Sequence, residues 1–455
     1  TTDDFVQAIA DGACADGTPL DFDLEQFKTW YYQAGTPQLS VRRQWDGSTG
    51  KLSLQLEQAT AATPDQPNKQ PLVLPITLAL IGAQGRIGDE QLLVMKDNTA
   101  SITLQGEIGS DEPALSLLRG FSAPVVVRME QSLEECLQLL AADDDSFCRW
   151  DAAQRLARQI LLARSRGERQ TEVEQALIQA LAAQIAAYQG MDGAELAAVL
   201  ALPGLAELEA LQAPVDPPAL FQALRGWMTA LGQQLNQPLN QLLATTRDEW
   251  SRVWPEGQGG RALTGLAWSW LAAAGDQTAC DAALQAVSGP SMTLARAALR
   301  ALLPLEIPQR DQALATFYDR WKAKPVILDA WFAMEASAPR ADGLARVQQL
   351  LEHPRFDPLA PNSLRAVLGG FAANVPVFHA IDGSGYLFMA DQIAAVDARN
   401  PITASRLAKI FSRCNSYGME RQQAMQNAIK QLSEQPLSPN TREVVQLLSP
   451  ESQSQ

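Results

Sequence analysis

Side chains that could bind a metal or act as a base are scarce in this sequence and lie far apart. Its two histidines, His353 and His379, are separated by 26 positions, so neither H-E-x-x-H nor a histidine-rich cluster occurs. The sequence also lacks the phosphate-binding G-x-x-x-x-G-K-[ST] loop and the G-x-S-x-G nucleophile motif. An enzyme built from these residues alone would depend on carboxylates, lysines or one isolated histidine. We interpret both histidines as structural or surface residues, because no other ligand types accompany them.

Two further groups could bind ions but have simpler interpretations. The carboxylates of Asp143, Asp144 and Asp145 are adjacent, so they cannot converge on one face of a helix. We expect Asp145 to cap a helix N-terminus and its two neighbours to face the helix dipole. The segment Asp382–Tyr386 reads Asp-Gly-Ser-Gly-Tyr and could cradle a phosphate. It follows helical sequence and contains no lysine, which favours a glycine turn between two helices.

The cysteines also show no spacing that indicates a reactive or metal-binding site. They are odd in number, scattered along the chain, and without a C-x-x-C pair. We therefore expect buried free thiols in a reducing compartment. The five positions are Cys14, Cys136, Cys148, Cys280 and Cys414.

The charge balance restricts the partners of the protein. Asp and Glu number 51, Lys and Arg number 36, and the formal net charge is −15. A surface this acidic repels phosphate backbones and anionic lipids, so we expect neither a nucleic-acid nor a membrane partner. One of the longest uncharged apolar stretches, residues 262–275, has only 14 residues, which is too short to span a bilayer. No basic, apolar and small-residue leader opens the sequence, so we expect no signal peptide.

The elements that must position these residues change along the chain. Apolar residues at helical spacing predict two short helices before residue 37, the second over Asp23–Tyr32. From about residue 38 the period becomes 2, as in Leu52, Leu54 and Leu56. Six to eight short antiparallel strands in about 90 residues predict a small β-sandwich, with a hairpin at residues 46–50. Pro75 lies within a strand pattern, so we expect it at an edge or a bulge.

From Ser132 onward the sequence predicts helices only. Alanine- and leucine-rich segments, such as residues 171–188 and 218–248, alternate with short turns that contain Gly, Pro, Asn or Asp. Many antiparallel helices over roughly 320 residues, without one long bundle pattern, favour an α-solenoid. No strict sequence period appears, so we expect an irregular array. The predicted fold class is a multidomain α+β protein, with a small antiparallel β-sandwich followed by a large α-helical superhelix.

Several strings, in the same order along the chain, resemble one bacterial enzyme family, the aminopeptidase N enzymes. The resemblance extends from Asp3 to about Leu448, and its strength comes from the combination of strings. These strings lie at Trp30–Pro37, Lys69–Leu72, Phe121–Val125, Arg149–Gln154, Phe378–Ala380, Asp382–Tyr386 and Ala398–Pro401.

The resemblance implies a zinc-dependent aminopeptidase of the gluzincin class, located in the cytoplasm. Such enzymes have an N-terminal β-domain, a thermolysin-like catalytic domain, a small β-sandwich and a C-terminal helical superhelix. Their zinc ligands, H-E-x-x-H plus a distant Glu, match nothing here, so the one zinc ion is expected in the full-length enzyme and no cofactor in this chain. The implied domains are residues 1–37 as the tail of the catalytic domain, 38–130 as the sandwich and 131–455 as the superhelix.

We therefore interpret the chain as the C-terminal portion of an enzyme that removes N-terminal residues from peptides. It would supply no catalytic residue, would be inactive alone, and would cover the active-site chamber. Its partners would be the missing N-terminal and catalytic domains, and peptide substrates in the full enzyme. The resemblance also implies that Arg365 and Arg406 line the chamber on the concave face, without bidentate carboxylate partners. From the residues alone, both are ordinary solvated arginines.

A different class of function is also open at this stage. A free-standing helical scaffold would bind protein partners through its concave face. The two short helices before residue 37 argue against the scaffold, because two small helices without a core partner do not form a domain.

Overall fold

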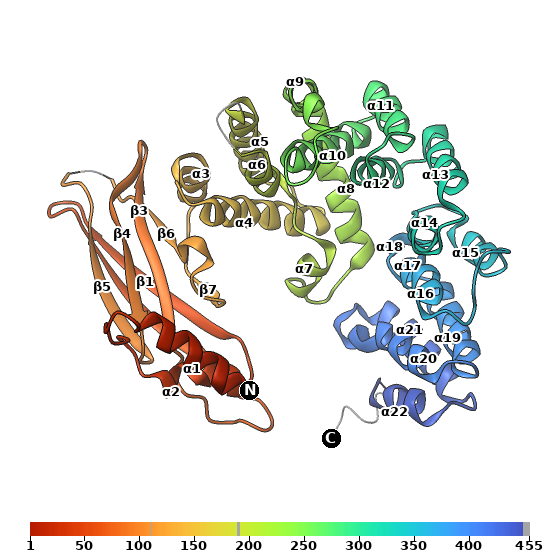
Figure 1. Ribbon diagram of the computed structural model, residues 1–455, viewed down its shortest axis with the longest axis horizontal. Coiled ribbons are helices and arrows are strands. Elements are labelled where there is room, and N and C mark those ends of the chain that lie inside the picture. Colours follow the sequence, from red (N-terminus) through yellow and green to blue (C-terminus); the bar gives the residue numbers. More distant parts are fainter. Residues whose placement is uncertain (110, 189–191, 449–455) are drawn as a thin grey trace. The chain divides into compact units, whose positions relative to one another are not determined.

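The computed structural model describes residues 1–109, 111–188 and 192–448 (Figure 1). The chain divides into two units, Thr1–Leu156 and Ala157–Gln455, and this boundary lies within one helix, α4 (Ser146–Ser165). In the described part, a β domain of two sheets precedes a large helical domain, which confirms the predicted fold class. The finer division at residues 37 and 130 stays a prediction.

Two short helices open the first unit, as the apolar spacing predicts. Helix α1 (Thr2–Ala13) begins with a capping box, in which the Thr1 side chain accepts from the Asp4 N–H and Asp4 bonds back to residue 1. Helix α2 (Leu24–Tyr32) is capped by Asp23, whose side chain accepts from the Glu25 N–H. The side chains of α1 bury little, because only two residues of the helix, Val6 and Ala10, are enclosed.

Strands in two sheets form the sandwich that follows. One sheet has the order β5-β2-β1-β7 and the other β4-β3-β6. The period-2 leucines Leu52, Leu54 and Leu56 are buried between the sheets, as the pattern predicts. The strand pairs are antiparallel except β1 with β7, which is parallel and departs from the expectation. The bounds are β1 (Pro37–Asp46), β2 (Lys51–Thr60), β3 (Leu74–Gly82), β4 (Gly85–Met95), β5 (Thr99–Gln105), β6 (Ala114–Leu117) and β7 (Val126–Arg128).

Pro75 lies in β3, the central strand of its sheet, yet it occupies a local edge. Strand β6 pairs with β3 only from Leu78 to Ile81 and does not reach Pro75. Thr77 is two residues after Pro75, so its N–H points to the same side of the strand as the nitrogen of Pro75. This N–H donates to Ser122 Oγ at 3.1 Å. Proline therefore removes no ladder hydrogen bond at this position.

The three adjacent aspartates after α3 (Leu133–Ala142) are arranged around one arginine. Asp145 caps α4 by accepting from the Cys148 N–H, as predicted. Asp143 and Asp144 were expected to face the helix dipole, and they also bind an arginine. Arg119 donates to Asp143 at 2.7 Å and to Asp144 at 2.5 Å. Arg119 also donates to Glu90 at 2.6 Å, and its side chain is only 4% exposed. The sequence could not show this, since η1 (Arg119–Phe121) is distant from both partner segments along the chain.

The second unit is helical, and its helices follow one another in sequence order (Figure 1). The first are α5 (Thr171–Ala186), α6 (Gly193–Leu200), α7 (Leu205–Ala210), α8 (Pro217–Gln234), α9 (Asn236–Thr246), η3 (Arg247–Glu249), α10 (Gln258–Ala273), α11 (Gln277–Val287) and α12 (Met292–Leu302). Next are α13 (Pro308–Trp321), α14 (Pro325–Ser337), α15 (Gly343–Leu351), α16 (Pro361–Leu364), the π-helical η4 (Arg365–Gly369), α17 (Gly370–Ala372) and α18 (Val375–Phe378). The last are α19 (Ser384–Asp397), α20 (Pro401–Ala408), η5 (Lys409–Ser416), α21 (Met419–Ser433) and α22 (Pro439–Leu448).

One predicted helix, residues 218–248, is two helices in the structure. Helix α8 ends at Gln234, and α9 begins at Asn236. Pro238 explains the break, because its ring would clash with the carbonyl four residues earlier, that of Gln234. In the new helix Pro238 occupies the first turn, where a missing N–H costs nothing.

Helix α10 packs against α6, α8 and α12 with unusually close backbones. A Cβ atom at Gly232 of α8 would lie 2.0 Å from the Trp270 carbonyl oxygen. One at Gly259 would lie 2.5 Å from the Ala194 nitrogen of α6, and one at Gly265 would lie 2.9 Å from Ala297 of α12. These glycines therefore set how near the neighbouring helices can come.

Substituting Arg119 should destabilise the first unit strongly. In Arg119→Met, the fully buried Asp143 carboxylate loses its only ion pair among the described residues, and we expect a loss of about 3–5 kcal/mol in free energy of unfolding. Urea unfolding would measure it. Arg128→Met, at an exposed arginine, is the matched control, and Asp143→Leu in the Arg119→Met background should recover part of the loss. Equal stability of Arg119→Met and Arg128→Met would contradict the assignment.

Candidate functional site

Both histidines have structural environments, as predicted. His379 Nδ1 and the Tyr386 hydroxyl lie 2.7 Å apart in a buried pair, and the His379 carbonyl accepts from Arg421 Nε. Burial, with a smaller contribution from the Arg421 charge, lowers the pKa of His379 to about 4. His353 packs its ring edge-on against Phe332 and accepts the Arg355 N–H at Nδ1. In residues 1–109, 111–188 and 192–448, no three His, Cys, Asp or Glu side chains form a group that could hold a metal ion.

The Asp-Gly-Ser-Gly-Tyr segment contains the end of the predicted turn between α18 and α19 and the first three residues of α19. Asp382 Oδ1 accepts from the Ser384 N–H at 3.0 Å and from its hydroxyl at 2.8 Å. Gly383 has φ +73°, and a Cβ at Gly385 would lie 2.5 Å from the Phe378 carbonyl oxygen. Both glycines are required by the local backbone, so the segment has no need of a phosphate to explain its composition.

The cysteines are free, and four of the five are buried. Cys14 is only partly buried, which corrects the expectation for that residue, because α1 buries few of its side chains. Burial raises the pKa of Cys136 and of Cys414 to about 11, and it raises the pKa of Cys148 further. These three thiols therefore stay protonated at neutral pH and are poor nucleophiles.

Arg365 and Arg406, the two arginines singled out by the resemblance, are exposed on elements that contact each other. Arg365 opens η4 and donates to the Asn362 side-chain oxygen at 2.7 Å. Arg406 is on α20, which Asn400 caps by accepting from the Thr403 N–H. No carboxylate in the part of the chain described by the structure forms an ion pair with either guanidinium. That the two arginines line a chamber stays a prediction.

Local backbone geometry positions Arg365. The π-helical turn of η4 widens the helix by one residue, and such turns are frequent at functional sites. Next to it, a Cβ at Gly370 would lie 2.9 Å from the Ala333 carbonyl oxygen, so glycine allows α14 to pack tightly behind η4. Arg365 therefore extends from η4, a segment that is held in place by its packing against α14.

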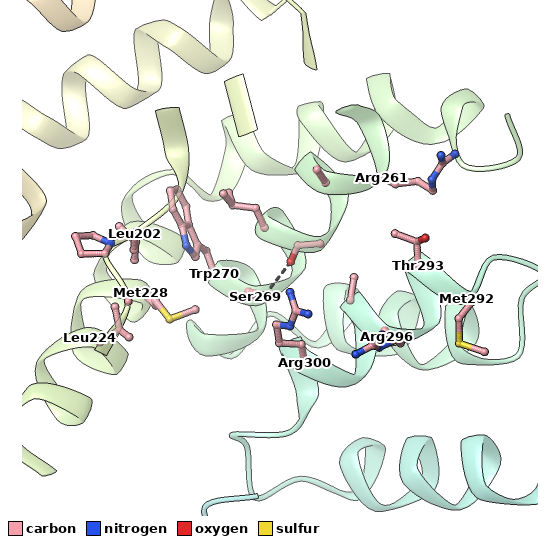
Figure 2. Close-up of a pocket in the computed structure, with 16 residues that line it drawn as sticks. Leu202, Leu224, Met228, Arg261, Ser269, Trp270, Met292, Thr293, Arg296 and Arg300 are labelled. Carbon is pink, nitrogen blue, oxygen red and sulfur yellow. Dashed lines mark hydrogen bonds between the residues drawn. The ribbon is translucent and has the colours of Figure 1, made fainter. Parts of the chain in front are cut away.

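A pocket that the sequence analysis did not identify lies in the second unit between α8, α10, α12 and the residues that precede α7. We call it the α12 pocket; its volume is about 750 Å³ (Figure 2). Arg261, Arg296 and Arg300 line it together with Ser269. Leu224, Met228, Leu266 and Trp270 form what we call its apolar floor. The only sequence signal that we recognise for this pocket is the spacing of Arg296 and Arg300, which places both on one face of a helix.

Comparisons with known proteins cover almost the whole chain. A family model described as a domain of unknown function with an Ig-like fold (DUF3458) matches residues 35–130. A second, described as a domain of unknown function with ARM repeats (DUF3458_C), matches residues 133–449. No membrane-spanning candidate is found among the described helices, since none combines sufficient length with sufficient apolarity.

Curated relatives carry the name aminopeptidase N. That of Escherichia coli K12 is 32% identical over 444 residues, which cover 95% of this chain and 50% of the relative. That of Caulobacter vibrioides is 33% identical over 441 residues, covering 93% and 49%. The chain therefore spans about half the length of the curated relatives it matches. Among solved structures, Legionella pneumophila aminopeptidase A in complex with aspartic acid aligns with a TM-score of 0.81 and 26% identity, over 98% of this chain and 52% of that one.

The buried state of His379 predicts a specific pH dependence of stability. In the unfolded chain the imidazole binds a proton below about pH 6.5, whereas in the folded chain its pKa of about 4 keeps it neutral. Its effect on stability is therefore negligible above pH 6.5, and stability falls as the pH drops from 6.5 to 4, because the unfolded state binds more protons there. The loss attributable to His379 is up to about 3 kcal/mol.

Urea unfolding at pH 7 and pH 4.5 would measure this loss. Carboxylates also titrate in this range, but their contribution is the same in each variant and cancels when the variants are compared. His379→Gln should show a smaller decrease in stability between these pH values than the unsubstituted protein. His353→Gln is the matched comparison, because His353 is less buried and burial lowers its pKa too. An identical decrease in the unsubstituted protein and His379→Gln would contradict the prediction.

Proposed function

Because the chain belongs to the family defined by the DUF3458 Ig-like and ARM-repeat domains, and matches the C-terminal portion of aminopeptidase N, we propose that it is the C-terminal part of a zinc-dependent aminopeptidase. In the intact enzyme this part would cover the active-site chamber and restrict entry to peptides. The enzyme would remove N-terminal residues from peptides in the cytoplasm.

The observation that carries this proposal is the continuity of the match. Identity of 32% extends over 95% of the chain, so the sandwich and the helical array are related to the same protein, in the same order. The solved aminopeptidase aligns over both units, at 98% of the chain. A free-standing scaffold that shared only a helical architecture would not require the sandwich to match as well.

A second observation supports a missing protein partner at the start of the chain. Helices α1 and α2 expose four large apolar or aromatic side chains, with Phe5 and Ile9 each 60% exposed. Phe5 and Ile9 are four residues apart and share one helix face, and Tyr31 and Tyr32 are exposed on α2. Exposed apolar groups of this kind are typical of interaction surfaces. In our proposal the catalytic domain covers this face, which favours it over the scaffold alternative.

The residues of this chain do not fit a catalytic zinc site. The buried His379 is already paired with Tyr386, and His353 is separated from acidic or thiol ligands that could complete a site in the described segments. A catalytic site requires three protein ligands and an open position. We therefore assign the zinc ligands and the catalytic base to residues outside this chain and derive no chemical step from the residues within it.

In this proposal Arg365 and Arg406 face the substrate. A guanidinium is charged at every physiological pH and forms a planar fork that suits a peptide carbonyl or carboxylate. Their lack of ion pairs within the described residues supports the role, because a neutralised arginine would attract a substrate less strongly. The remaining partners are the N-terminal and catalytic domains, and the acidic surface argues against nucleic acid.

The proposed function is tested first by extending the reading frame upstream. We expect an H-E-x-x-H motif followed by a distant Glu in the same frame, and its absence would favour the scaffold. The 455-residue chain and the extended enzyme are then purified and compared. We expect one zinc ion and hydrolysis of alanine p-nitroanilide only for the extended enzyme, because two separated histidines cannot replace the ligand set. Stoichiometric zinc with chelator-sensitive hydrolysis by the 455-residue chain would contradict the prediction.

The substrate role of the two arginines is tested in the extended enzyme. Arg365→Ala or Arg406→Ala should raise KM for longer peptides about tenfold, the cost of one charge-assisted hydrogen bond. Neither should change KM for a single-residue chromogenic substrate, which is too short to reach them. Arg399→Ala, at a neighbouring exposed arginine, is the control. Equal changes for long and short substrates would count against the role, as would no change for either.

A further inference from the structure

The α12 pocket is basic in a protein that is strongly acidic overall. The formal net charge is −15, yet the residues that line the pocket include three arginines and no Asp or Glu. Arg296 and Arg300 follow each other at i and i+4 on α12, which puts their Cβ atoms about 5–6 Å apart. Two planar forks at that spacing can both donate to one carboxylate.

The positive charge of this pocket is not neutralised by the described part of the chain. In residues 1–109, 111–188 and 192–448, neither Arg296 nor Arg300 forms an ion pair or a hydrogen bond, and both are exposed. The buried Arg261 guanidinium donates to the main-chain carbonyl oxygens of Glu249, Arg252 and Glu256, so the open positive charge of the pocket comes from Arg296 and Arg300. Such a site attracts an anion, because no internal carboxylate has to be displaced.

A further arginine adds to this field from α8. The Arg225 guanidinium lies 4.0 Å from the sulfur of Met228, a residue of the apolar floor. Burial lowers the pKa of Arg225, and within the described residues its guanidinium forms no ion pair. A cation that is partly removed from water, without a counter-ion, extends its field further than an exposed one.

The rest of the pocket is suited to an apolar group. Figure 2 shows Leu202, Leu224 and Met228 beside Trp270 at one end and Arg296 at the other, with Arg300 and Ser269 between them. The volume of about 750 Å³ falls within the range that small ligands occupy in proteins. The pocket therefore combines a cationic end with an apolar floor, and its ligand should carry an anion next to an apolar body.

We propose that the α12 pocket binds the C-terminal residue of a peptide, with the carboxylate on Arg296 and Arg300 and the side chain on the apolar floor. An anion site follows from the geometry alone, whereas the choice of a peptide as its carrier rests on the proposed function. The positive field disfavours the ammonium group at the other end of a peptide, so the pocket selects one terminus. It differs from the pair Arg365 and Arg406, which belongs to η4 and α20.

The test uses the purified 455-residue chain and requires no hydrolysis, so it is independent of whether the chain is part of a peptidase. The ligand is an N-acetylated peptide of three alanines and a C-terminal leucine, as free acid and as carboxamide. Calorimetric titration at low salt should give at least ~10-fold tighter binding of the acid, since the amide loses the charge-assisted hydrogen bonds. The double variant Arg296→Gln and Arg300→Gln should lose this preference. Arg399→Gln, an exposed arginine elsewhere, should retain it.

The floor and the alternative arginine pair are tested in the same way. Replacing the C-terminal leucine by glycine should weaken binding of the acid at least ~10-fold, because the floor loses its apolar contact. Inorganic phosphate as a competitor separates a simple anion site from a peptide site. Equal binding of acid and amide would overturn the inference. The inference would also be overturned if the double variant Arg365→Gln and Arg406→Gln lost the preference for the acid while the double variant Arg296→Gln and Arg300→Gln kept it. It would be overturned as well if phosphate competed with the peptide and binding did not depend on the C-terminal leucine.

Discussion

The close approach of backbones around α10 is the constraint on which the helical unit depends. Gly232, Gly259 and Gly265 let α8, α6 and α12 approach to distances at which no Cβ atom would fit. Large apolar side chains, including Trp227 and Trp268, fill the remaining space and are fully buried. Any larger residue at these glycines would move a whole neighbouring helix, because packed interiors adjust little to added volume. The same approach fixes α12, and with it the position of Arg296 and Arg300.

Local patterns in the sequence predicted the elements well, because a strand period or a helix cap is contained within a few residues. The alternation of Leu52, Leu54 and Leu56 and the capping of α4 by Asp145 are examples. The break at Leu235 was missed, although Pro238 signalled it, since the apolar pattern continues across the break. The parallel pairing of β1 with β7 was beyond local reasoning, because it joins strands far apart in sequence.

The candidate site shows the same division. The structural roles of His379 and of the Gly383 turn could be inferred, because isolation from other ligand types is visible in one dimension. The α12 pocket could not, since its arginines and its apolar floor come from helices that only the fold brings together. Arg119 with its aspartates is a further case. Arg365 and Arg406 entered through resemblance alone, and no local feature of the sequence distinguishes them from solvated arginines.

The position of Pro75 has a consequence for association between copies of the protein. A sheet edge with free N–H groups is a template on which a strand of another molecule can add, and this is a common start of aggregation. Beyond the end of β6, the open side of β3 has few free N–H groups. Pro75 has no N–H, and the N–H of Thr77 is already bonded to Ser122. One imino acid and one hydroxyl thus leave this stretch of β3 without a free N–H for edge-to-edge growth.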